Sequence, residues 1–202
     1  MNANIAVIGG TNMTSRLPGT WQEPHRDVPF PPQEARRLWT EEAIPKLKSV
    51  ASTFGGYITY QDLGDHLFEA TKVRTTSLLP RWIGQPLYRV LDYCEGQSLP
   101  GITALVVQKG SGMVGPGFND WFRRRNRGPA DNEVELEAFA AEERLASYRL
   151  YCPDVPDNAV PMPTPQLARA VHTGTMEWPW APPPCSGCGR PLNFYEPCPV
   201  CI

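Results

Sequence analysis

The feature that most constrains this chain is a set of paired cysteines near its C-terminus. Four of the six cysteines lie between residues 185 and 201, in the pattern C-x2-C-x9-C-x2-C. Zn²⁺ prefers four ligands in a tetrahedron, and thiolates suit it well. Protein side chains fill all four positions, so no position stays open for a reacting water. We therefore expect a structural zinc ribbon with one Zn²⁺ ion, held by Cys185, Cys188, Cys198 and Cys201.

A disulfide pair or a redox C-x-x-C is the alternative interpretation of these cysteines. It needs an oxidising compartment or a thioredoxin-like strand-to-helix context, and neither is visible. The N-terminus lacks the basic and apolar regions of a secretory signal. No stretch approaches the ~18 apolar residues of a membrane span. These observations predict a cytoplasmic location without a membrane segment, in which the metal supplies the folding energy of the ribbon.

Proline clusters divide the chain into segments. The 23 prolines are concentrated in residues 17–32 and 153–184, which favours extended structure at both places. Trp178 and Trp180 in the second stretch are candidate anchors for a protein partner. The predicted organisation is an extended N-terminal arm (1–32), a globular domain (33–151), a Pro-rich linker (152–184) and the zinc ribbon (185–202).

Hydrophobic periodicity predicts a helical domain with one hairpin. Apolar residues recur at three- and four-residue steps in four segments, which begin near Gln33, near Tyr60, within 77–96 and near Asp131. We expect Pro45 to kink or split the first of these helices. Residues 102–118 are β-branched around a Gly-Ser-Gly tip, which indicates a hairpin. The order predicts a mainly α fold with a small β-hairpin, a winged helix-turn-helix with its wing at 104–118.

Charge is unevenly distributed along the chain. Residues 70–130 contain nine basic and three acidic side chains, a net charge of +6 in a chain whose total is −2. A positive stripe on the third helix, the wing and the segment after it would attract phosphates. A solvated basic loop at WFRRRNRG is the alternative explanation of that run.

Three short segments resemble a known family. ITYQDLG (58–64), RWIGQPL (81–87) and VVQKGSGMVG (106–115) are similar to the DNA-binding domain of the O6-alkylguanine DNA alkyltransferases and the alkyltransferase-like proteins. The resemblance implies a helix-turn-helix that enters the minor groove of DNA. It also implies that Tyr60 crowds the target phosphate and that Arg81 fills the gap left by a flipped base.

The chain departs from that family at the reactive position. The family's Pro-Cys-His-Arg corresponds here to residues 102–105, and Thr103 stands where the nucleophilic cysteine would be. No histidine follows to activate a nucleophile, and a lone threonine is a weak one. Alkyl transfer is therefore not expected, and we predict a protein that is not an enzyme and has no small-molecule substrate.

Two hypotheses about function follow from the sequence. The first is a non-enzymatic protein that grips duplex DNA, with the ribbon contacting DNA or a partner. The second is a subunit of a larger nucleoprotein or defence complex that docks a protein partner through residues 152–202. The candidate nucleic-acid contacts are Tyr60, Arg74, Arg81, Trp82, Gln85, Arg89, Lys109, Ser111, Arg123, Arg124, Arg125 and Arg127.

Overall fold

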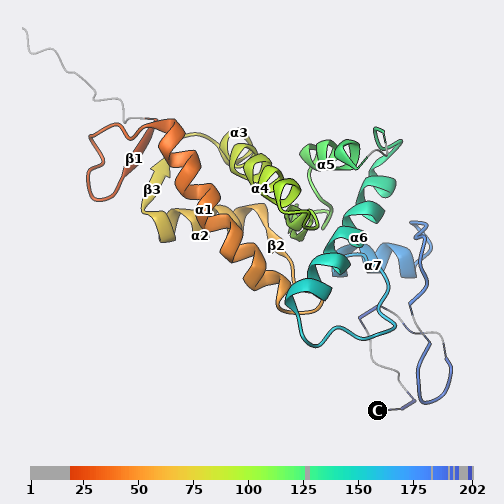
Figure 1. Cartoon of the computed structure of the whole chain (residues 1–202). Helices are drawn as coiled ribbons and strands as arrows, with labels where there is room; N and C mark the ends of the chain where they lie inside the picture. Colours follow the sequence, from red (N-terminus) through yellow and green to blue (C-terminus); the bar gives the residue numbers. More distant parts are fainter. Residues whose placement is uncertain are drawn as a thin grey trace, which may run out of the picture.

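The computed structural model describes residues 19–125, 128–182, 184–190, 192, 194–195 and 200–201. This part of the chain is mainly helical and contains two small two-stranded sheets (Figure 1). None of its helices combines the length and the apolar character that a membrane crossing demands. The helices are α1 (Pro32–Ala51), α2 (Tyr60–Thr71), α3 (Leu79–Trp82), α4 (Gly84–Gly96), α5 (Asn119–Arg124), α6 (Glu133–Tyr151) and α7 (Pro165–His172), with 3-10 turns η1 (Ile102–Leu105) and η2 (Pro116–Phe118).

Helix α1 forms because one side of it is apolar at regular steps. Five residues at four-residue spacing are buried against α2, α4 and η1, and Pro45 lies within the same continuous helix. The expected split at this proline is therefore not seen. The buried residues are Ala35, Trp39, Ala43, Leu47 and Ala51.

Helices α2 and α4 begin where local chemistry places them. The hydroxyl of Thr59 accepts a hydrogen bond from the backbone N–H of Asp62 at 3.1 Å, which caps α2 as the sequence predicts. The helix expected within 77–96 corresponds to α4, which begins at Gly84 and ends at Gly96, and a separate short helix, α3, precedes it. Pro86 lies in the first turn of α4, where a missing N–H costs little.

The strands are shorter than expected and pair differently. Strand β1 (Thr20–Gln22) is antiparallel to β3 (Val73–Thr75), so part of the N-terminal segment is fixed to the domain. Strand β2 (Ile58–Thr59) is parallel to β4 (Val106–Val107). The expected hairpin over 102–118 is reduced to one antiparallel bridge, between Val107 and Val114, and residues 102–105 form a 3-10 turn. The structure thus confirms a mainly helical chain with little sheet.

The core has an aromatic part and a helical part. Trp82 is buried, with its ring 4.5 Å from that of Trp39 and stacked on that of Phe68 at 4.8 Å. Helix α5, which the sequence analysis took for a basic segment, buries Trp121 and Phe122. Helix α6 is buried on several sides, because the chain after it folds back along it (Figure 1).

Candidate binding pocket and metal centre

A large cavity of about 590 Å³ opens between α2, α3, α4 and the segment after β4. Its size lies within the usual range for ligand pockets, roughly 300–1,000 Å³, and its walls are mostly apolar. Sequence reasoning did not identify this cavity, because its walls come from segments far apart in the chain. The residues that line it are Tyr60, Gln61, Leu79, Pro80, Ile83, Gly84, Leu87, Tyr88, Leu91, Thr103, Gln108, Lys109, Gly115, Pro116, Gly117 and Phe118.

Thr103 lines this cavity from η1. The residue is only 5% exposed, and its hydroxyl Oγ1 has no hydrogen-bond partner among the residues that the structure describes. Leaving a buried hydroxyl unpaired costs about 1–3 kcal/mol, so such groups are uncommon in native cores. The unpaired hydroxyl is therefore a polar group available to a ligand inside an otherwise apolar cavity.

Tyr60 also lines the large cavity and holds Gly115, another of its lining residues, in place. Its hydroxyl oxygen accepts a hydrogen bond from the backbone N–H of Gly115 at 3.1 Å. Burial raises the pKa of the Tyr60 phenol, although the bond from Gly115 acts in the opposite direction. A Cβ atom at Gly115 would lie 2.5 Å from the Tyr60 hydroxyl, so this close approach requires glycine.

A buried ion pair fixes the loop next to Gly115. Glu137 on α6 is fully buried, accepts a hydrogen bond from the backbone N–H of Val114 at 2.8 Å, and pairs with Arg144 at 2.6 Å. Arg144 also donates to the carbonyl of Ala104 at 3.2 Å, next to Thr103. The pair therefore holds two segments that line the large cavity, the turn η1 next to Thr103 and the loop next to Gly115.

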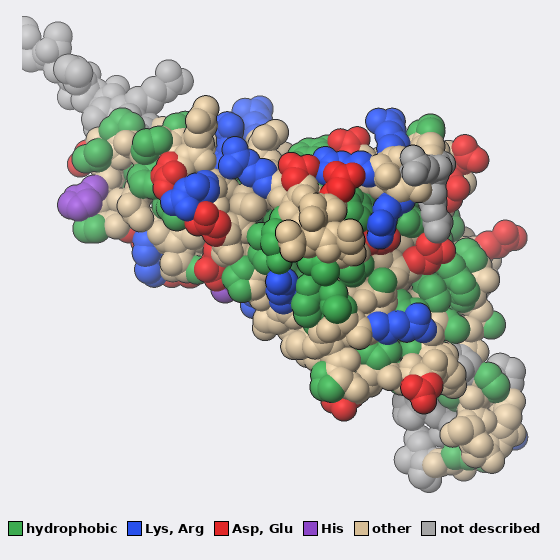
Figure 2. Space-filling view, viewed as in Figure 1, with side chains coloured by type: hydrophobic (Ala, Val, Ile, Leu, Met, Phe, Trp, Pro, Cys, Tyr) green, Lys and Arg blue, Asp and Glu red, His purple; other side chains and the backbone are tan. Residues whose placement is uncertain are grey.

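The predicted basic stripe is largely neutralised by acids within the fold. Arg74 bonds to Glu23 and Glu69, and Arg124 bonds to Asp92 and Glu95. Two of these acids, Glu23 and Glu69, lie outside residues 70–130, so the charge count over that window could not include them. On the face shown in Figure 2, basic side chains lie at several separate places, and some of them lie beside acidic side chains.

The arginines of α5 have partners as well. Arg125 lies 3.6 Å from Glu143 and stacks over the ring of Trp121 at 5.0 Å, and Arg123 lies 3.6 Å from Asp120. Arg127 is outside the described residues. The cluster at 123–125 is thus partly used by the fold itself.

Three predicted cations have no ion pair within the described part of the chain: Arg81, Arg89 and Lys109. Lys109 lines the large cavity, and Arg81 follows Pro80, which also lines it. Arg89 lies on the exposed side of α4.

The remaining predicted contacts lie in different environments. Gln85 is on the exposed side of α4, and Ser111 is on the loop after β4, where its hydroxyl accepts from the N–H of Met113 at 3.2 Å. Trp82 belongs to the aromatic core and is only 7% exposed. Its ring is therefore not presented to a nucleic acid in this structure.

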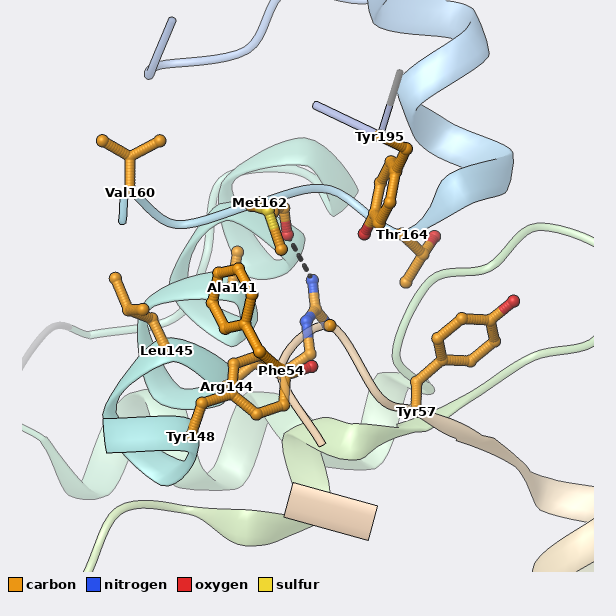
Figure 3. Close-up of a pocket in the computed structure, with 11 residues that line it drawn as sticks. Phe54, Tyr57, Ala141, Arg144, Leu145, Tyr148, Val160, Met162, Thr164 and Tyr195 are labelled. Atoms are coloured by element: carbon orange, nitrogen blue, oxygen red, sulfur yellow. Dashed lines mark hydrogen bonds between the residues drawn. The ribbon is translucent and has the colours of Figure 1, made fainter. Parts of the chain in front are cut away.

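A second, small cavity of about 10 Å³ is lined by Arg144 (Figure 3). Its walls include Phe54, Tyr148, Met162 and Thr164, together with the ring of Tyr195 from the C-terminal segment. The guanidinium of Arg144 donates to the carbonyl of Met162 at 3.4 Å, the bond drawn in Figure 3.

The C-terminal cysteines form a cluster that could hold a metal ion. The sulfurs of Cys185, Cys188 and Cys201 all lie within 4.8 Å of one another. Two sulfurs bound to one tetrahedral Zn²⁺ at ~2.3 Å are about 3.8 Å apart, so this spacing fits zinc. The turn is tight, with the N–H of Gly189 donating to the carbonyl of Cys185 at 2.8 Å and Gly189 at φ 71°. Cys198 is outside the described residues.

The comparisons with known proteins do not place this chain in a family: it matches no family model, no curated protein and no solved structure. The resemblance of residues 58–64, 81–87 and 106–115 to the alkyltransferases therefore stays a prediction. The three segments nevertheless contribute lining residues to the same large cavity.

Proposed function

We propose that this chain is a non-enzymatic protein that binds duplex DNA through a winged helix and takes one unstacked base into the large cavity. The observation that carries the proposal is the cavity itself. It is mostly apolar, it contains the unpaired buried hydroxyl of Thr103, and Lys109 lies in its wall.

The shape and chemistry of the cavity suit a nucleobase. A base presents flat apolar faces and a polar edge, so it needs apolar walls with a few hydrogen-bonding groups. Here Thr103, Tyr60 and Gln108 supply such groups among the lining residues. Opening a base pair costs a few kcal/mol, and this cost falls when the pair is mismatched or damaged. The protein should therefore favour duplexes with a weakened step.

The lining residues favour binding over group transfer. They include neither a histidine nor a carboxylate that could activate the Thr103 hydroxyl as a nucleophile. Arg81, beside the cavity, would fill the space left in the duplex, as the resemblance implies. Arg89 and Lys109 would contact phosphates, because neither is held by an acid within the described residues.

A structural zinc ion completes the proposed protein. Cys185, Cys188 and Cys201 would hold it together with Cys198, and the ion would supply the folding energy that so short a ribbon lacks. It has no catalytic task in this proposal, because protein ligands fill all four positions.

A salt titration of duplex binding tests this proposal. The wild-type chain should bind a duplex containing one mismatched pair more tightly than the matched duplex. Arg81→Ala should weaken both complexes, and Lys109→Ala should reduce the slope of log K against log salt by about 0.9. Lys46→Ala, which removes a cation of α1 that does not line the cavity, is the matched control and should leave the slope unchanged. Equal retention of DNA by all four proteins would refute the proposal.

A second candidate, a protein-docking subunit, is favoured by a separate observation. The fold neutralises much of the basic stripe, and Leu78, beside the cavity-lining Leu79, is 66% exposed. An apolar side chain of a partner protein would also fit the large cavity. Co-purification of a stable partner together with absence of duplex binding would favour this candidate.

A further inference from the structure

Tyr195 links the cysteine cluster to the body of the protein. It lies in the chain between the two cysteine pairs, and its ring forms part of the small cavity (Figure 3). Its hydroxyl donates a hydrogen bond to the carbonyl of Pro163 at 2.6 Å, although 40% of the residue remains exposed. The ribbon is thus attached to residues 162–164 at a defined point.

Residues 162–164 are in turn bonded to two parts of the core. The carbonyl of Met162 accepts from Arg144, and the hydroxyl of Thr164 donates to the carbonyl of Gly112 at 2.9 Å. Thr164 is only 2% exposed, so this second bond is shielded from water. A Cβ at Gly112 would lie 2.4 Å from the Thr164 hydroxyl, which shows how closely the two segments approach.

Both connections continue to the large cavity. The N–H of Gly112 donates to the carbonyl of Gln108 at 2.8 Å, and Gln108 lines that cavity. Arg144 pairs with Glu137, which holds the N–H of Val114 beside the lining residue Gly115. Tyr195 is therefore connected to the loop 108–115 by hydrogen bonds at both ends of the short backbone segment 162–164.

We propose that metal binding in the ribbon seats Tyr195 against residues 162–164 and thereby fixes the loop 108–115, so that zinc content controls the shape of the large cavity. The ribbon is too short to order itself without metal, so its contribution to this series of bonds depends on the ion. This inference rests on the proposed zinc site, and it adds regulation of the cavity to the proposed function.

Amide hydrogen exchange on the full chain tests the inference without any DNA. Three samples are compared: the chain with one Zn²⁺ bound, the chain after treatment with a chelator, and the chelated chain after zinc is returned. Removing zinc should speed exchange at 108–115 by roughly tenfold, because the backbone N–H groups of Gln108, Gly112 and Val114 are hydrogen-bonded and local opening governs their exchange. Returning zinc should restore the slow rates, while the buried side of α1 should not change.

Two tyrosine variants test the physical link. Tyr195→Ala with zinc bound should speed exchange at 108–115 as much as zinc removal does. Tyr57→Phe is the matched control, because Tyr57 lines the same small cavity and its hydroxyl makes no hydrogen bond to any described residue. That control should exchange like the wild type.

The inference is overturned if zinc removal speeds exchange only within 185–201, or if Tyr195→Ala leaves 108–115 protected. Zinc stoichiometry, measured on every sample, separates this result from failure of the zinc site itself. Failure of the duplex-binding proposal would show in the salt titration and would leave the exchange result standing.

Discussion

The small cavity and the large cavity are both connected to the turn η1, yet side chains of the protein fill only the small one. Ala104 in η1 accepts a hydrogen bond from Arg144 of the small cavity, while the adjacent Thr103 lines the large one. In the small cavity, the residues after α6 and the ring of Tyr195 fill the space to about 10 Å³. In the large cavity, about 590 Å³ stay open.

The two cavities also differ in how their buried polar groups are satisfied. In the small cavity, Thr164 donates to Gly112 and the buried ion pair has several partners. In the large cavity, the hydroxyl of Thr103 has no hydrogen-bond partner within the described part of the chain. The small cavity is therefore a structural contact between segments of the fold, whereas the large cavity has the features of a site for a ligand from outside the chain.

The largest expected effect comes from breaking this structural contact at Arg144. Arg144→Met leaves the Glu137 carboxylate, which is 0% exposed, without its cation. Removing one partner of a buried pair costs about 3–5 kcal/mol of unfolding free energy. Urea denaturation followed by circular dichroism measures this loss.

Two further variants sharpen that measurement. The double variant Glu137→Met with Arg144→Met should lose less than the sum of the single losses, because neither charge of the pair is left buried without its partner. Arg37→Met removes an exposed pairing with Glu34 and Glu41 on α1 and should unfold like the wild type. A wild-type midpoint for Arg144→Met would show that the pair does not support this structural contact.

A smaller effect is expected from alkaline pH at the same structural contact. Burial raises the pKa of Tyr148 to about 12 from an ordinary value near 10, and its hydroxyl donates to the carbonyl of Gly56 at 2.6 Å. Since the folded-state pKa is the higher one, this stabilisation is complete below pH 10 and is lost as the pH rises towards 12. Each pKa unit corresponds to ~1.4 kcal/mol.

Tyr148→Phe isolates this titration. At pH 8 the variant should be less stable than the wild type, because it lacks the hydrogen bond to Gly56. Between pH 10 and 12 the difference should shrink, since only the wild type must release a proton from a buried phenol. Urea midpoints at pH 8, 10 and 11 measure the trend, and a constant difference across these values would contradict it.

The sequence predicted those parts of the fold that depend on local pattern. The apolar steps of α1, the Thr59 cap of α2 and Pro86 in the first turn of α4 each act within a few residues. The cysteine spacing predicted the cluster of Cys185, Cys188 and Cys201 for the same reason.

The predictions that were wrong or missing concern features that depend on residues far apart in the chain. Strands of two or three residues, such as β1 and β4, are too short to show alternation. Trp121 and Phe122 are adjacent, so they show no helical period that would have revealed α5. The basic stripe lost most of its free charge to acids such as Glu23 and Glu143, whose positions only the fold reveals.

The candidate site was only partly predictable for a related reason. Tyr60, Thr103 and Lys109 were each singled out from the sequence, yet the cavity that they share was not. Glu137 was missed because a carboxylate in a helix is normally assigned to the solvent side. Its partners within the fold are Arg144 and the backbone N–H of Val114, and the approach of Val114 from a distant segment has no local signal in the sequence.

The smallest expected effect distinguishes the cavities most directly, through two threonines that are both nearly fully buried. Thr164→Val removes a hydroxyl that donates to Gly112, so it should destabilise the protein by about 1 kcal/mol. Thr103→Val keeps the shape and removes an unpaired hydroxyl, so it should stabilise the free protein by about 1 kcal/mol. Urea midpoints at an unchanged slope measure both.

The two variants should change the free energy of unfolding in opposite directions, so each variant is the control for the other. If the Thr103 hydroxyl serves a ligand, Thr103→Val should weaken binding of a mismatched duplex while it stabilises the free protein. Loss of stability in Thr103→Val would mean that the hydroxyl already has a partner within the fold. The polar groups of the large cavity would then be satisfied within the fold, and only its volume would remain as an argument for an outside ligand.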